Sequence, residues 1–166
     1  VSGVLMALMD WLQARSVIRS LMTELAAEFS GNVSMTVRDG FDLVVVECSR
    51  SPDAVGLHAE IGTRKPMALT ASGRALLLAS APQVMEDFLV GLARRSPPQA
   101  KKLRAWTKVN KRTFVASGYT TSMGDENPHI NGIAVALWSR ELREHMALSI
   151  AVLANAREFD QLMQRA

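Results

Sequence analysis

The sequence predicts a domain of mixed helices and strands, with one long helix first, a hairpin after it and a second hairpin near the end. Apolar residues recur in steps of three and four from Val4 to Phe29, which is the period of an amphipathic helix. Apolar and polar, or bulky and small, residues alternate over 33–38 and again over 131–153, which is the period of a strand. The length of 166 residues suits one domain with a hydrophobic core.

The composition and charge bound the class of protein. Apolar residues make up 48% and charged residues 21% of the chain, which is ordinary for a soluble globular protein. The net charge of +3 is too small to indicate a strongly basic nucleic-acid binder. No apolar run is long enough to cross a membrane, and the apolar start lacks the basic segment of a signal peptide. The single cysteine, Cys48, excludes an internal disulfide, so we expect a cytoplasmic protein with no membrane partner.

The first predicted helix covers residues 4–29, and its core stripe consists of Trp11, Ile18, Met22, Leu25 and Phe29. The first three turns also carry apolar residues outside that stripe, namely Leu5, Met6, Met9 and Leu12. A helix that is apolar nearly all round is buried on more than one side. We therefore expect its N-terminal half to contact a partner subunit or an upstream domain; a frayed chain end is the alternative.

Three strands are predicted after this helix. Ser30-Gly31-Asn32 ends the helix, and residues 33–38 then alternate as a half-buried strand. Asp39-Gly40 is a hairpin-turn signal, so residues 41–48 form the second strand, whose central valines indicate burial on both faces. A loop over 50–53 leads to a third strand, which we expect over Val55–Ile61.

Residues 62–79 predict an extended segment that delivers the chain to a helix start. Pro66 favours extended backbone before it, and Thr70 or Ser72 offers a hydroxyl that can cap the helix. The small residues Ala71 and Gly73 leave the free backbone N–H groups of the first turn unscreened, so this corner can hold a carboxylate or another small anion. The alternative is that Ala71 and Gly73 only let the helix pack close to a sheet.

Two further helices and a strand are predicted before residue 124. Apolar residues spaced through 84–92 follow a proline start at Ala81-Pro82, and Ser96-Pro97-Pro98 breaks that helix. The next helix, 99–117, has an apolar side that consists of Leu103, Trp106, Val109, Phe114 and Val115. Gly118 ends it, and residues 119–123 form a strand before the polar turn 124–128.

A cluster of basic residues accompanies these helices without an acidic residue inside it: Arg94, Arg95, Lys101, Lys102, Arg104, Lys108, Lys111 and Arg112. Such a cluster can contact phosphates. The segment offers no base-stacking aromatic side chain apart from Trp106, which lies on the apolar side. We therefore favour a solvated face over a phosphate-binding surface.

The two final strands, 131–139 and 144–153, each have one face of small residues. In the first strand this face holds Gly132, Ala134 and Ala136, and in the second it holds Ala147, Ser149 and Ala151. If the two strands pair in matching register, the sheet has one bulky face and one bare face. The bare face leaves room for a closely packed helix or for a ligand, and both remain open. A last helix is expected over 156–165.

No residue pattern indicates catalysis, a cofactor or a metal site. Cys48 ends an apolar strand with no histidine near it, so a buried structural thiol is favoured over a nucleophile. The histidines lack metal-ligand spacing, and Asp125, Glu126 and His129 lie in what we expect to be a solvated turn. Phosphate-binding loops and nucleophile elbows are also missing from the sequence. We therefore expect a protein that is not an enzyme.

The segment Ile-Gly-x-Arg-x-Pro, followed by Thr-Ala-x-Gly-Arg-Ala, resembles the signature of the effector-binding domain of IclR-type transcriptional regulators. The resemblance covers nearly the whole chain. It includes Val-Ser-Met-Thr-Val-Arg-Asp-Gly after the first helix, Ser-Gly-Tyr at 117–119, Asp-Glu at 125–126 and Gly-Ile-Ala-Val at 132–135. Each piece is short, but the order and spacing of the pieces make the assignment specific.

The resemblance implies a GAF-like α+β fold, in which helices flank a central, mainly antiparallel sheet. It implies that residues 1–166 are the effector-binding, or sensory, domain, whose N-terminal winged helix-turn-helix partner domain is absent from this chain. Such domains bind small organic acids, assemble as homodimers or homotetramers, and act on DNA only through the other domain. Whether the regulator activates or represses stays open, and a ligand-free oligomerisation module on the same fold is the alternative function.

The resemblance also implies the ligand-binding residues. The family's ligand lies between the helix start and the sheet, which corresponds here to Ala71 and Ser72, next to the cap Thr70. Three further positions correspond to Ser122, where an aspartate is frequent in the family, Gly132 and Ser149. The small residues Gly132 and Ala151 replace polar groups of some members, so we expect an apolar pocket that suits an aromatic or larger apolar carboxylate.

Overall fold

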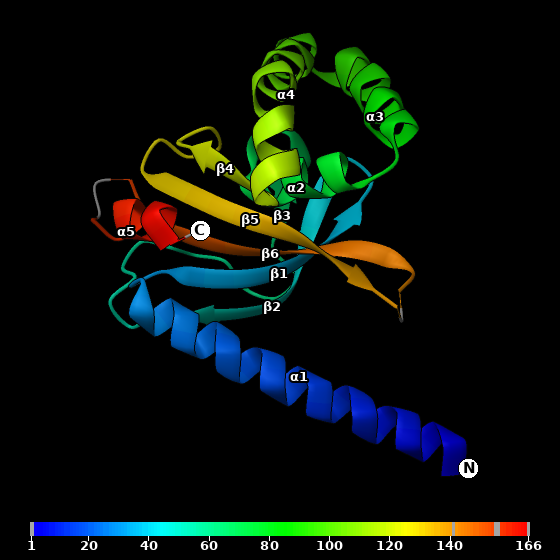
Figure 1. Ribbon diagram of the computed structural model, residues 1–166, viewed down its shortest axis with the longest axis vertical. Helices are drawn as coiled ribbons and strands as arrows, with labels where there is room; N and C mark the ends of the chain where they lie inside the picture. Colours follow the sequence, from blue (N-terminus) through cyan, green and yellow to red (C-terminus); the bar gives the residue numbers. More distant parts are fainter. Residues whose placement is uncertain (1, 141, 155–156, 166) are drawn as a thin grey trace.

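A computed structural model of the chain describes residues 2–140, 142–154 and 157–165, and shows one curled sheet with helices on both faces (Figure 1). The helices are α1 (Ser2–Glu28), the 3-10 helix η1 (Met67–Leu69), α2 (Ala71–Ala79), α3 (Pro82–Arg95), α4 (Pro97–Ser117) and α5 (Arg157–Arg165). The strands are β1 (Asn32–Asp39), β2 (Asp42–Arg50), β3 (Arg64–Pro66), β4 (Tyr119–Met123), β5 (Ile130–Ser139) and β6 (Glu144–Leu153). The α+β class is therefore confirmed.

The six strands form one sheet in the order β3-β2-β1-β6-β5-β4, and every neighbouring pair is antiparallel. The two predicted hairpins, β1–β2 and β5–β6, lie next to each other because β1 pairs with β6. On one face α2 packs against the small residues of β5, and α3 and α4 lie outside α2 (Figure 1). On the other face, α1 and α5 cover the bulky residues of β1, β5 and β6.

The C-terminal half of α1 packs against the second face of the sheet. Met22 and Ala26 are fully buried against Val33 and Met35 of β1. Val17 and Leu21 are exposed, because they lie on the side of α1 that faces away from the sheet. The N-terminal part of α1 runs beyond the sheet (Figure 1), and the expected burial of the side chains in its first three turns lies outside the described residues.

A buried carboxylate ties α1 to β2. Glu47 accepts a hydrogen bond from Arg15 Nε at 2.9 Å and lies 3.3 Å from Arg19 Nε. Burial opposes its ionisation, but the hydrogen bonds and charges of these arginines and the Cys48 N–H outweigh that effect and lower the pKa of Glu47. The charged contact therefore fixes the helix above the sheet at neutral pH.

The third strand was predicted at the wrong place. Val55–Ile61 contains no strand: residues 55–56 form a turn, with Gly56 at a φ of +86°, residues 57–60 are irregular, and Val55 is 77% exposed. A left-handed glycine interrupts an extended strand, so no strand begins at Val55. The edge strand β3 begins at Arg64, after a second turn at Gly62, and pairs with β2.

The two outer helices, α3 and α4, begin and end near the proline and glycine residues that predicted their ends. Prolines occupy the first turns of both α3 and α4, and Gly118 ends α4 in the left-handed conformation. Leu103 is buried, but Val109 and Val115 are about three-quarters exposed, in contrast to the expected apolar side. The buried residues of α4, Ala100 and Leu103, lie in its first half, and the apolar side predicted for its second half is largely exposed. Within the described residues, no helix is long and apolar enough to cross a membrane.

Candidate ligand-binding site

The bare face of the sheet forms as the alternation predicts. Gly132 pairs with Ala151, Ala134 with Ser149 and Ala136 with Ala147, so the small residues of β5 and β6 are in matching register. Ala71 and Ala75 of α2 pack directly on Ala134. One part of the bare face is therefore covered by a closely packed helix, which is one of the two alternatives that the sequence left open. The remaining part, around Gly132, Ser149 and Ala151, lies beside the start of that helix and lines a cavity.

The helix start is built by Pro66, Thr70 and Gly73. The Thr70 hydroxyl accepts a hydrogen bond from Gly73 N at 3.2 Å and donates to Pro66 O at 3.2 Å, so Thr70 and not Ser72 is the cap. Helix geometry leaves the N–H groups of the first two helical residues, Ala71 and Ser72, without intrahelical acceptors. These two donors lie at the positive end of the α2 dipole, which favours an anion.

Three polar residues of β1 form one wall of the cavity, and the sequence analysis did not include them in the site. Asn32, Ser34 and Thr36 are each more than nine-tenths buried and line the cavity, whereas an exposed polar face was expected. They are buried because β1 lies inside the sheet, next to β6, with Ser34 opposite Ser149. The hydroxyls of Ser34 and Ser149 are 3.1 Å apart, which supplies the partner that a buried Ser149 needs. The polar residues at every second position mark this face of β1 in the sequence, but they do not show whether it is buried.

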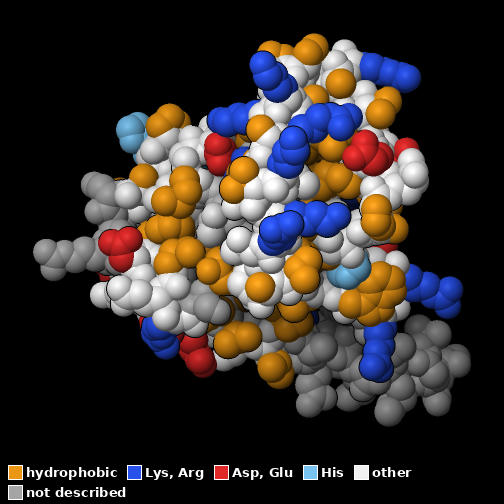
Figure 2. Space-filling model, turned by 45° about the horizontal axis from the view of Figure 1, so that its top comes forward, with side chains coloured by type: hydrophobic (Ala, Val, Ile, Leu, Met, Phe, Trp, Pro, Cys, Tyr) orange, Lys and Arg blue, Asp and Glu red, His pale blue; other side chains and the backbone are white. Residues whose placement is uncertain are grey.

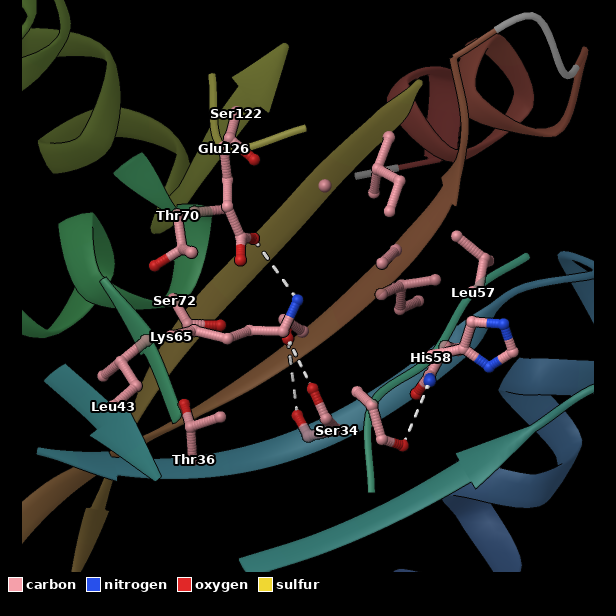
Figure 3. Close-up of a pocket in the computed structure, with 18 residues that line it drawn as sticks. Ser34, Thr36, Leu43, Leu57, His58, Lys65, Thr70, Ser72, Ser122 and Glu126 are labelled. Carbon is pink, nitrogen blue, oxygen red and sulfur yellow. Dashed lines mark hydrogen bonds and ion pairs between the residues drawn. The ribbon is translucent and has the colours of Figure 1, made fainter. Parts of the chain in front are cut away.

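These elements enclose one cavity of about 60 Å³, and every predicted ligand-binding residue lines it. The six residues are Thr70, Ala71, Ser72, Ser122, Gly132 and Ser149. Figure 3 shows Thr70 and Ser72 on one side, Ser34 and Thr36 on the strand opposite, and Ser122 with Glu126 at another edge. Residues from segments far apart in the sequence therefore converge on one space between α2 and the sheet.

An ion pair crosses the cavity. Lys65 Nζ on β3 lies 3.3 Å from Glu126 Oε2 in the β4–β5 loop, and both residues line the cavity (Figure 3). Their side chains are 23% and 32% exposed, so the pair lies where the cavity meets solvent. The sequence interpretation missed both residues, because nothing in their local pattern distinguishes them from other surface charges. Lys65 thus places a positive charge, paired with Glu126, at the mouth of the cavity.

A second, buried ion pair holds the helix start against the β4–β5 loop. Arg74 of α2 is 1% exposed, donates to Asp125 Oδ2 at 2.8 Å and to Thr121 O at 3.0 Å, and stacks on Trp106. Partial burial opposes ionisation of Asp125, but hydrogen bonds from Arg74 and Lys102 outweigh it and lower the pKa of Asp125. Asp125 thus has a structural partner and does not lie in a merely solvated turn. Among the described residues, no group of His, Cys, Asp and Glu side chains is arranged to hold a metal.

The basic cluster is exposed to solvent. Lys and Arg side chains gather over α4 in Figure 2, and all eight residues of the cluster are exposed. Arg104, Lys108 and Lys111 border a wider hollow of about 670 Å³ between α2, α3 and α4, whose floor includes Leu77 and Leu89. The exposure agrees with the solvated-face interpretation.

The family of the chain follows from its sequence. The family model described as "Bacterial transcriptional regulator IclR C-terminal" matches residues 6–164. The chain therefore belongs to the IclR family of bacterial transcriptional regulators and corresponds to their C-terminal domain. This family membership is the one that the motif around Pro66 and Gly73 indicates. The role of the family is regulatory and not enzymatic.

Two curated relatives are HTH-type transcriptional regulators. The chain is 24% identical over 147 residues to the HTH-type transcriptional regulator KipR of Bacillus subtilis (strain 168), covering 86% of this chain and 57% of KipR. It is 26% identical over 139 residues to the HTH-type transcriptional regulator TsaQ1/TsaQ2 of Comamonas testosteroni, covering 82% and 50%. The chain thus spans about half the length of the curated relatives it matches.

Solved structures show the same fold. An IclR family transcriptional regulator from Brucella abortus superposes with a TM-score of 0.76 at 24% identity, over 84% of this chain and 52% of that one. The C-terminal domain of a putative transcriptional regulator from Vibrio cholerae gives 0.70 at 18% identity, over 91% and 87%. The Thermotoga maritima IclR gives 0.68 at 15% identity, over 84% and 57%. These similarities confirm the GAF-like α+β architecture that the resemblance implied.

Proposed function

We propose that this domain senses a small organic carboxylic acid, which binds in the cavity between α2 and the bare face of the sheet. The observation that carries the proposal is that Ala71, Ser72 and Lys65 line one cavity, because helix geometry leaves the N–H groups of Ala71 and Ser72 without intrahelical acceptors. Helix N-termini and lysine ammonium groups both favour carboxylate oxygens. The hydroxyls of Ser72, Ser122 and Ser149 line the same space and can orient the acid.

The volume of the cavity favours a small acid. A space of about 60 Å³ holds roughly four or five water-sized groups, since one such group needs about 10–15 Å³. This volume supports an acid of a few carbons over the aromatic acid that the small residues Gly132 and Ala151 suggested. The reason is that Ala71 and Ala75 bring the first turns of α2 directly onto Ala134 of the sheet, which leaves little space beside the helix start.

Regulation requires that the acid bind two arrangements of the protein with different affinity. In this proposal the two arrangements differ in how the domain associates with other subunits and with the separate DNA-binding domain of the whole regulator. The helix α1 is the route to that domain, because its N-terminal part extends away from the sheet (Figure 1). The alternative is an oligomerisation module without ligand, in which the cavity holds only water.

A thermal-shift screen of the domain against small aliphatic and aromatic carboxylates tests the proposal. A ligand that binds only the folded state stabilises it by mass action, by about 2.7 kcal/mol when the ligand concentration is a hundred times its Kd. The melting temperature rises as a result. We expect at least one small aliphatic acid to raise the melting temperature, and Ser149→Leu to abolish the rise by filling the cavity.

Ser117→Leu is the matched control, because it makes the same change on the exposed end of α4. This variant should respond to the acid as the unchanged protein does. If no carboxylate raises the melting temperature of the folded protein, the oligomerisation module replaces the sensor. If Ser149→Leu responds as strongly as Ser117→Leu, the acid binds elsewhere.

A further inference from the structure

The mouth of the cavity carries one positive and one negative side chain. Lys65 Nζ lies 3.3 Å from Glu126 Oε2, and both residues line the cavity between α2 and the sheet (Figure 3). Among the described residues that line this cavity, they are the one lysine and the one glutamate, and no arginine or aspartate lies there. With histidine counted as neutral, the charged side chains of the site therefore sum to zero.

The two charges come from opposite edges of the sheet. Lys65 lies on the edge strand β3, and Glu126 follows the other edge strand, β4. The neighbour of each residue is anchored: Arg64 pairs with carboxylates of the β1–β2 hairpin, and Asp125 pairs with the buried Arg74 of α2. The backbone on both sides of the ion pair is thereby held, so the two charges stay together at the mouth of the cavity.

Two opposite charges side by side favour a ligand that carries both signs. A plain carboxylate that approaches Lys65 also approaches Glu126, whose negative charge lies 3.3 Å away and opposes it. A plain ammonium group meets the converse, attraction from Glu126 and repulsion from Lys65. A zwitterion that lies antiparallel to the pair is attracted at both ends, and the ion pair stays intact. The site therefore suits a ligand that is neutral overall.

The separation of the two charges matches an α-amino acid. Standard backbone bond lengths place the ammonium nitrogen and the nearer carboxylate oxygen of such a molecule about 3 Å apart. In Figure 3 the side chain of Lys65 passes Ser72 at the start of α2, so a carboxylate there can also accept from the Ala71 and Ser72 N–H groups. Ser122 lies at the same edge as Glu126, and its hydroxyl can accept from the ammonium group.

From this arrangement we infer that the ligand is a small α-amino acid, bound as a zwitterion with its carboxylate at Lys65 and α2 and its ammonium group at Glu126. The inference rests on the proposed function and adds a second charged group to the acid. A cavity of about 60 Å³ limits the side chain to a hydrogen, a methyl or a hydroxymethyl group, as in glycine, alanine and serine. The ion pair is then the feature that determines specificity.

Isothermal titration calorimetry with matched compounds tests the inference. Propionate and ethylamine each carry one of the two charges of alanine, and β-alanine carries both with one more carbon between them. We expect one enantiomer of alanine to bind more tightly than propionate and than ethylamine, each by about fivefold or more, the contribution of one partly exposed charge contact. β-Alanine should bind less tightly than this enantiomer, because its charges fit the pair less well.

Two variants of the ion pair assign the roles of its members. Glu126→Gln should weaken alanine and strengthen propionate, which abolishes or reverses the preference between them. Lys65→Met should weaken both alanine and propionate and strengthen ethylamine, because Glu126 is then unpaired. Glu86→Gln is the matched control: it makes the same change in an exposed ion pair with Arg104, away from the cavity, and should leave every affinity unchanged. Circular dichroism checks that the three variants are folded.

The outcomes distinguish this inference from the proposed function. If propionate binds as tightly as alanine, or if other carboxylates bind and the small amino acids do not, the zwitterion assignment is overturned and the carboxylate sensor stands. A preference for alanine that survives in folded Glu126→Gln also overturns it, and so does β-alanine binding as tightly as alanine. If neither amino acids nor other carboxylates bind the folded protein in a broad screen, the proposed function fails and this assignment fails with it.

Discussion

Replacing Gly73 by alanine is expected to destabilise the domain by about 3 kcal/mol or more, the upper part of the range for forcing extra atoms into a packed site. A Cβ at this position would lie 2.1 Å from Met67 O and 2.4 Å from Met67 Cα. Both atoms are backbone, so no side-chain rotation relieves the clash. For a domain of this length the melting temperature should fall by roughly 6–12 °C.

Whether Gly73→Ala lowers or raises the stability of the domain tests the contact between α2 and η1. Alanine is the better helix former by about 1 kcal/mol, so without the clash Gly73→Ala would stabilise α2. The matched control is Gly132→Ala, whose Cβ would come tightly only against the Ser122 hydroxyl, at 3.2 Å, and would lie at ordinary contact distance from Ile150 O and Ala71 Cβ, at 3.7 and 3.8 Å. We expect the control to melt within a few degrees of the unchanged protein. A Gly73→Ala variant that melts at the same temperature or higher would show that η1 and α2 are not in contact as described.

Replacing Arg74 by methionine should have the second large effect. The guanidinium is buried, and its loss leaves Asp125 Oδ2, Thr121 O and Ala68 O without this donor. Removing one partner of a buried ion pair costs about 3–5 kcal/mol. Because Asp125 is 18% exposed and keeps Lys102 at 3.1 Å, we expect a loss of about 3 kcal/mol in urea unfolding.

Acidification and a surface control test the cause of that loss. The folded-state pKa of Asp125 is lowered, so its ion pair stabilises the fold above the ordinary aspartate range, and this stability is lost as the pH falls through the lowered pKa. The difference between the unchanged protein and Arg74→Met should therefore shrink in acid. Arg104→Met breaks a half-exposed pair with Glu86 and should cost less than about 1 kcal/mol. Equal losses in the two variants would contradict a buried role for Arg74.

The regular elements could be predicted because their periods are determined locally. The alternation of small and bulky residues on β5 and β6 predicts the bare face, and pairing in register then follows from burial of the other face. The corner at Pro66, Thr70 and Gly73 was likewise predicted from turn and cap chemistry. Since the cavity lies where these two features meet, the six predicted residues converge on it, although their contact with a ligand remains a proposal.

The parts that could not be predicted depend on which strands are neighbours. Ser34 and Thr36 look solvent-exposed in the sequence, because alternation alone does not tell a buried polar face from a wet one. Only the placement of β1 beside β6 turns that face toward the cavity. Arg74 is similar: nothing near it in sequence shows that it meets Asp125, which is far along the chain. The strand predicted over Val55–Ile61 does not form, because Gly56 and Gly62 at its two ends adopt left-handed turn conformations.

The most direct test of the carboxylate site is an NMR titration of the 15N-labelled domain with the acid that raises its melting temperature most. If the carboxylate binds at the start of α2, the amide signals of Ala71 and Ser72 should move farthest, since their N–H groups become hydrogen-bond donors to it. Signals from Arg104, Lys108 and Lys111, beside the wider hollow, should stay nearly unchanged. Large shifts there, with Ala71 and Ser72 unmoved, would contradict the account and place the acid on α4.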